Sequence, residues 1–171
     1  FLCIAITGAL NAQILSKFLT DRMLQREGEL TMELVERIAR TEGIDGLFLS
    51  GDTGSRAVRF AGFFAQLAAM PGVLRANIYD RQAFLVWSSE SALTGKHFPD
   101  NPELDKALTG QLAVHFGRVG ESNKPEHVRL DGRLYHVETY VPVYDGEREV
   151  VGVVEVYRVP ARLLAAIQDG Q

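Results

Sequence analysis

The sequence predicts an α+β domain in which helices flank an antiparallel sheet of five or six strands. Two observations carry this prediction. Apolar residues recur at three- and four-residue steps up to residue 41, which is the period of a helix that packs on one side. From residue 73 onwards, runs rich in Val, Tyr and Thr alternate with polar residues, and turn sequences such as Asp131-Gly132 separate them. With 171 residues the chain is long enough for one domain with its own core.

The first expected element is one long helix over residues 11–41, which contains no proline. Gly28 weakens its middle by about 1 kcal/mol relative to Ala, so two helices with a break at Gly28 are the alternative. A helix of this length is longer than is needed to cover a small sheet. We therefore expect it to form a stalk or the interface of a homodimer. The glycines at residues 43–46 end the helix. Its apolar positions are Ile14, Phe18, Leu30, Leu34 and Ile38.

Residues 1–10 form an uncharged apolar run that contains the single cysteine, Cys3. Ten residues are too few to cross a bilayer, which takes roughly 20. The apolar character is continuous rather than periodic. We therefore expect the end of a transmembrane helix here, with the first turns of a buried helix as the alternative.

The remaining elements follow from caps, turns and alternation. A second helix is expected from Asp52 or Thr53 to Ala69, where Pro71-Gly72 stops it. A hairpin then joins strands at residues 73–79 and 84–88. A loop and a short helix, capped by Asp100 or Asn101, fill residues 89–110. Further strands are expected at residues 112–119, 126–130, 133–144 and 149–158, and a short helix at residues 161–167.

One face of the predicted sheet is apolar and the other is polar. Successive side chains on a strand point to opposite faces, so each strand can be divided by parity. An antiparallel sheet commonly packs one face on the core, so we expect function on the other face. The polar face carries Arg75, Asn77, Tyr79, His136, Glu138, Tyr140, Glu155 and Tyr157.

Several stretches resemble a known family. They are VLRANIYD at 73–80, LVWSSE at 85–90, LTGKHF at 93–98, NPELDKALTG at 101–110, ETYVPV at 138–143 and VVGVVEVY at 150–157. They are similar to the PAS-like extracytoplasmic sensor domains, called single Cache or PDC domains, of bacterial membrane receptors. The resemblance covers residues 11–168, and residues 11–171 are expected to form a single domain of this kind. It implies a five-stranded sheet that holds a small ligand outside the membrane.

The resemblance also implies a location and an output. The domain would be periplasmic or extracellular, in an inner-membrane receptor, with transmembrane helices at both ends and a homodimer through the N-terminal helix. The output would be a histidine kinase, with a diguanylate cyclase or a chemotaxis receptor as alternatives. The chain departs from the carboxylate-sensing members because its central strands lack their cluster of basic residues, so the ligand class stays open. A structural or dimerisation module without a ligand is the main rival.

The candidate ligand-binding residues lie on the polar face and beside the 89–110 segment. Buried charges need partners, so an Arg that faces two Glu can equally form a structural network. A polar face open to solvent is the third alternative. Trp87 also suits a core position and His97 an exposed loop. The full candidate set is Arg75, Asn77, Tyr79, Trp87, His97, His136, Glu138, Tyr140 and Glu155.

Other classes of function find little support in the sequence. The net charge of -4 gives no basic surface for nucleic acid. His115, His127 and His136 have no metal-ligand spacing, so neither a metal nor another cofactor is expected. A nucleophile elbow and a glycine-rich phosphate loop are both missing from the sequence. Glu138 and Glu155 alone do not make a glycosidase, and we predict that the domain is not an enzyme.

Overall fold

The computed structural model describes residues 2–49, 58–118 and 135–159, with side chains omitted for residues 2–13 and 49. The statements below refer to these residues. The helices are α1 (Leu2–Glu42), α2 (Gly46–Leu49), α4 (Ala61–Ala68) and α5 (Pro102–Leu108), with a 3-10 turn η1 (Ser91–Leu93). The strands are β1 (Val73–Asp80), β2 (Leu85–Ser88), β3 (Ala113–Arg118), β4 (Tyr135–Tyr144) and β5 (Val150–Arg158).

The five strands form one antiparallel sheet in the order β2-β1-β5-β4-β3. The last strand therefore lies between the first and the fourth, with Asn77 opposite Glu155 on one side and Tyr140 opposite Glu155 on the other. This confirms the predicted α+β class and the antiparallel sheet. The strand predicted at residues 126–130 and its Asp131-Gly132 turn lie outside the described residues.

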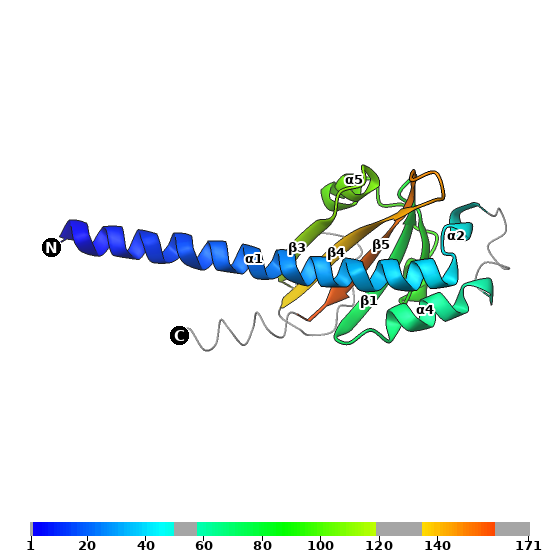
Figure 1. The fold of residues 1–171 in the computed structure, drawn as a ribbon, viewed down its shortest axis with the longest axis horizontal. Helices are drawn as coiled ribbons and strands as arrows, with labels where there is room; N and C mark the ends of the chain where they lie inside the picture. Colours follow the sequence, from blue (N-terminus) through cyan, green and yellow to red (C-terminus); the bar gives the residue numbers. More distant parts are fainter. Residues whose placement is uncertain (1, 50–57, 119–134, 160–171) are drawn as a thin grey trace.

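Helix α1 runs without interruption through Gly28, so the prediction of one long helix is confirmed and the two-helix alternative is wrong. Gly28, Thr31 and Val35 are buried at helical spacing and face the sheet. At Gly28 the helix approaches β3 so closely that an added Cβ would overlap Cγ2 of Val114. The N-terminal part of α1 projects beyond the sheet (Figure 1).

The membrane prediction is not decided by this fold. Among the described residues, no helix is both long enough and apolar enough to cross a membrane. The expectation that residues 1–10 end a transmembrane helix stays a prediction. The C-terminal helix expected at residues 161–167 lies outside the described residues.

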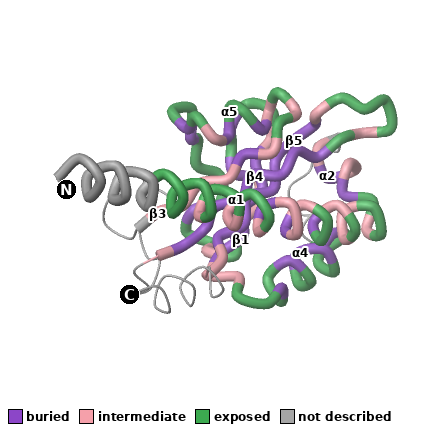
Figure 2. The backbone as a smooth tube through the Cα atoms, turned by 60° about the vertical axis from the view of Figure 1, so that its left-hand side comes forward, coloured by how far each residue is buried: buried purple, intermediate pink, exposed green. Residues whose placement is uncertain are grey.

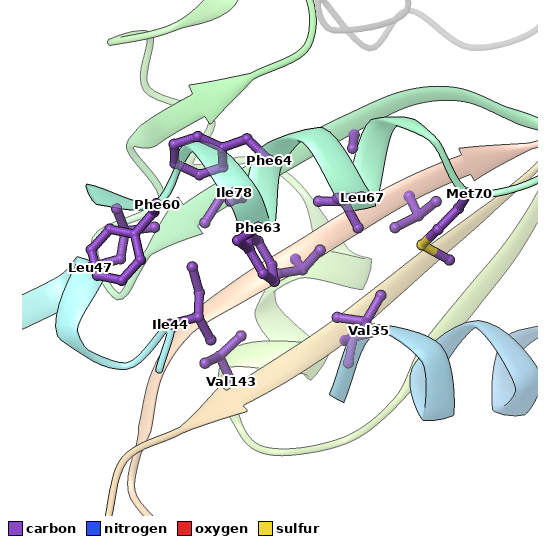
Figure 3. Close-up of a cluster of buried hydrophobic side chains, with 14 of the residues drawn as sticks. Val35, Ile44, Leu47, Phe60, Phe63, Phe64, Leu67, Met70, Ile78 and Val143 are labelled. Carbon is purple, nitrogen blue, oxygen red and sulfur yellow. The ribbon is translucent and has the colours of Figure 1, made fainter. Parts of the chain in front are cut away.

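The main core lies between the apolar sheet face and helices α1 and α4 (Figure 3). Phe63 and Leu67 of α4 are fully buried there against the sheet residues Ile78 and Val154. The predicted start of this helix at Asp52 or Thr53 lies outside the described residues. Helix α2 was not predicted: Gly43 takes the left-handed conformation (φ 60°) that ends α1, but Gly46 begins a new short helix.

The polar sheet face is covered by the segment from η1 to α5, which packs on β3, β4 and β5. Leu93, Leu104 and Ala107 of this cover are buried against the sheet. Asn101 rather than Asp100 caps α5, because its Oδ1 accepts a hydrogen bond from the backbone N–H of Leu104 at 3.0 Å. The central strands are buried along most of their length (Figure 2), so the alternative of a solvent-open face is wrong.

Candidate ligand-binding face

The strand register brings the polar residues together in two adjacent rows. Neighbouring strands place directly opposed side chains about 5 Å apart, so each row is a line of contacts across β1, β5 and β4. The first row is Arg75, Tyr157 and Glu138, and the second is Asn77, Glu155 and Tyr140. His136 and Tyr79 extend the same face along β4 and β1. We call these eight residues the polar face.

All eight side chains are buried. Arg75 is 3 % exposed, and the two glutamates and His136 are 0 % exposed. A buried carboxylate is strongly unfavourable unless donors satisfy it, so a fold retains such a set only with an organised network or with a bound partner. The polar face therefore differs from the apolar face in chemistry and not in exposure.

Glu155 is the centre of one half of the network. Its Oε2 accepts hydrogen bonds from Nδ2 of Asn77 at 2.7 Å and from the hydroxyl of Tyr79 at 2.8 Å. The amide of Asn77 is held in turn, because the hydroxyl of Ser88 donates to its Oδ1 at 2.7 Å. Both donors to Glu155 are neutral. They orient the carboxyl of Glu155 but bring it no positive charge.

Glu138 is the centre of the other half. The hydroxyl of Tyr140 donates to its Oε2 at 3.0 Å, and Nε2 of His136 lies 2.9 Å from its Oε1. Nδ2 of Asn101 donates to the hydroxyl of Tyr140 at 3.1 Å. Because Asn101 also caps α5, this hydrogen bond joins the cover directly to the polar face.

The burial of these groups changes their acidity. Burial raises the pKa of Glu155, and the charge of Glu138 raises it further. The polar groups of Tyr140, Tyr157 and Asn77 beside the carboxyl lower the pKa of Glu155 and offset part of this increase. The pKa values of Tyr140 and Tyr157 are raised first by burial and then by the charge of Glu155, so both phenols stay neutral at physiological pH.

The structure separates two predicted residues from the others. Trp87 lies opposite Ile78 and stacks on Phe64 of α4, with ring centroids 4.5 Å apart, so it belongs to the apolar face. His97 is exposed and stacks on Phe84 at 4.3 Å, and its Nε2 lies 2.9 Å from the carbonyl oxygen of Gln82. The other seven candidates share the polar face.

Two members of the network were not recognised as site residues from the sequence. Ser88 was missed because the pairing of β1 with β2 shifts between Ile78 and Tyr79, so strict alternation along β2 fails. Asn101 was expected only as a cap, and its second role depends on where α5 meets β4. The available signal was its position as the first residue of the stretch at 101–110, one of those that resemble the PAS-like sensor domains.

The described residues also form a groove away from the polar face. A groove of about 590 Å³ lies on the α1 side, between the end of this helix and the β4–β5 turn. Its charged side chains, such as Arg40 and Arg148, are exposed or only partly buried. The described residues offer no group of three His, Cys, Asp or Glu side chains close enough to hold a metal ion. The polar face is therefore the better candidate site.

Comparison with known proteins agrees with this architecture. No protein-family model matches the sequence, and no curated protein sequence matches it either. Among solved structures, the sensor domain of the histidine kinase DctB from V. cholerae matches with a TM-score of 0.62 at 15 % identity. That match covers 92 % of this chain and 58 % of the DctB chain. The E. coli DcuS sensor domain matches with a TM-score of 0.50 at 17 % identity, over 82 % of this chain and 97 % of that chain.

The chain has the PAS-like fold of bacterial sensor domains. The fold prediction made from the sequence is thereby confirmed. In this PAS-like fold the polar face is the inner surface of the sheet, and the η1–α5 segment packs against Tyr79 and Tyr140 of this face. This chain spans little more than half of the DctB sensor domain, so the likeness concerns one part of that structure.

Proposed function

We propose that this chain is the extracytoplasmic ligand-sensing domain of a bacterial membrane receptor, in the first place a sensor histidine kinase. The observation that carries the proposal is the buried polar face, with its two glutamates, Arg75 and His136. A few convergent polar groups within an apolar surround are what orient a small ligand in its binding site. The PAS-like fold shared with two sensor domains supports the same function.

Ligand binding would act on the output through β5. This strand carries Glu155 and Tyr157 and ends at Arg158. The guanidinium of Arg158 donates from Nη1 to Oγ1 of Thr31 on α1 at 3.1 Å, and from Nε and Nη2 to the carbonyl oxygen of Pro71 at 3.2 and 3.0 Å. A displacement of β5 would therefore be transmitted to α1 through the hydrogen bond between Arg158 and Thr31. A ligand shifts this equilibrium only if it binds one arrangement more tightly than the other.

The proposal includes anchoring in the membrane through flanking helices, and a homodimer along α1. Four apolar side chains on the projecting part of α1 are more than half exposed, at 52 to 60 %. Apolar patches of this kind mark interaction surfaces, and a second copy of the same helix would cover them. The four residues are Ile14, Leu15, Phe18 and Leu19.

The dimer is tested by the mass of the chain in solution. Phe18→Glu should shift a concentration-dependent dimer to monomer in size-exclusion chromatography with light scattering. Val58→Glu is the matched control, because Val58 is also exposed (81 %) but does not belong to α1. A wild-type chain that is monomeric at every concentration would contradict this part of the proposal.

We propose that the domain itself has no catalytic activity and that the receptor's output resides in another part of the protein. The buried carboxylates, the histidine and the tyrosines bind one another rather than lining an open cleft, which suits recognition better than turnover. If a ligand that binds the purified chain were converted to a product during calorimetry, this part of the proposal would be wrong.

A thermal-shift screen tests the sensor function. A panel of carboxylates, amino acids, amines and purines is added to the purified chain. A ligand at ~100 times its Kd stabilises the folded state by about 2.7 kcal/mol. The shift should disappear in Glu138→Gln and persist in His97→Ala, since His97 lies away from the polar face. If no compound in a broad panel stabilises the wild type, the structural-module alternative replaces this proposal.

A further inference from the structure

We propose that the polar face recognises a small primary amine, with the protonated nitrogen held by the carboxylate of Glu155 among the rings of Tyr79, Tyr140 and Tyr157. This inference rests on the proposed sensor function and adds the chemical class of the ligand. Because the η1–α5 segment packs against Tyr79 and Tyr140, it moves away from these rings to admit the amine and returns over it.

The first argument is the charge of the site. Glu155 and Glu138 lie on adjacent strands, and the register places neutral Asn77, not Arg75, opposite Glu155. The charge of Glu138 raises the pKa of Glu155, so the two carboxyls disfavour each other's ionisation. A bound cation beside Glu155 relieves this repulsion, whereas a carboxylate ligand at the same place would increase it.

The second argument is the hydrogen bonding of Glu155. Oε2 already accepts two hydrogen bonds, from Asn77 and Tyr79. Oε1 is buried and accepts no well-formed hydrogen bond from the described residues. Burying a carboxylate oxygen without a donor is unfavourable, because the oxygen loses its hydrogen bonds to water and gains none in the protein. An ammonium group supplies both the missing donor and the missing charge, and a primary amine keeps N–H groups for Oε1.

The third argument is the aromatic surround. Tyr79 donates to Glu155, Tyr140 lies opposite it, and Tyr157 is two residues along on the same face of β5. All three rings are fully buried. Aromatic faces attract cations, and cages of such rings are a recurrent way to bind amines. The Tyr157 ring already has the guanidinium carbon of Arg75 at 5.9 Å from its centroid, so this surface accommodates positive charge.

Isothermal titration calorimetry on the 171-residue chain tests the ligand class directly. The probes are ethylamine, ethanolamine and putrescine as primary amines, choline and tetramethylammonium as cations without N–H groups, and acetate and succinate as anions. We expect binding of at least one primary amine and at least tenfold weaker binding of both quaternary cations. Glu155→Gln should weaken the amine at least tenfold, while His97→Ala should leave its Kd unchanged.

The outcomes separate this inference from the proposed function. If acetate or succinate binds and no amine does, the amine assignment is overturned and the sensor function stands. If none of these probes binds and the broad screen also finds no ligand, both fail. Equal affinity for choline and ethanolamine would overturn the role of Oε1. The comparison among probes uses the wild-type chain alone, so it decides the question even if Glu155→Gln fails to fold.

Discussion

Gly28→Ala offers the sharpest test of how α1 meets the sheet. Two effects oppose each other at this position. Alanine is favoured over glycine inside a helix by about 1 kcal/mol. The new methyl group, however, would overlap Cγ2 of Val114 on β3, a β-branched side chain whose χ1 is restricted. Overpacking of this kind costs about 1–3 kcal/mol. The net expectation is a loss of stability of up to about 2 kcal/mol.

A second substitution separates the two effects. In a Val114→Ala background the clashing methyl is gone, and the new Cβ of residue 28 would lie 3.5 Å from Cβ of residue 114, an ordinary contact distance. Gly28→Ala should then stabilise the chain by about 1 kcal/mol, through helix propensity alone. The sign of the same substitution therefore reverses between the two backgrounds.

Urea unfolding of the four proteins of this cycle, at one fixed protein concentration, measures the reversal. The coupling energy between positions 28 and 114 should be about 1–3 kcal/mol. If Gly28→Ala changes the free energy of unfolding equally in both backgrounds, within about 0.5 kcal/mol, α1 does not approach β3 as described.

Three further predictions concern the core, the cover and the polar face. Leu67→Ala, at a fully buried position, should reduce the free energy of unfolding by about 2–5 kcal/mol in urea melts, whereas Val58→Ala at an 81 % exposed position should change it by less than about 0.5 kcal/mol. Asn101→Ala should lose about 1–2 kcal/mol, because both the cap of α5 and the hydrogen bond to Tyr140 disappear, while Asn101→Ser, which keeps a capping oxygen, should recover part of it; equal losses would show that the cap contributes nothing. The raised pKa of Glu155 means that the folded state holds its proton more tightly than the unfolded state, so the stability contributed by this group is fully present below its ordinary pKa of 4.5 and is lost as the pH rises through the raised value. Glu155→Gln should therefore gain on the wild type in thermal melts as the pH rises above 4.5, and a difference that does not change with pH would refute the reasoning.

Much of the fold could be predicted because its signals are local. The period of α1, the glycine that ends it and the alternation of β1, β4 and β5 each depend on residues near in sequence. Helix α2 escaped prediction because four residues after a turn carry too weak a periodic signal. The order of the strands in the sheet, by contrast, depends on residues that are far apart in the sequence.

The sequence predicted which residues form the candidate site, but it did not predict that they are buried. Parity along three strands placed Arg75, Glu138 and Glu155 on one face, and the register bears this out. For Trp87 the sequence left a core position as the alternative to ligand contact, and the structure places it on the apolar face, opposite Ile78 and stacked on Phe64. The burial of the polar face could not be foreseen, because it depends on where the η1–α5 segment settles.

The sequence by itself determined which residues form helices and strands and which side chains share a face, since these follow from backbone periods of 3.6 and 2 residues. Only the tertiary structure decided that β5 lies between β1 and β4. That insertion places Glu155 between Asn77 and Tyr140, which lie 78 and 15 positions before it in the chain. Hydrogen bonds between such distant residues form only once the sheet has assembled, and so the paired or unpaired state of a buried carboxylate is a property of the fold.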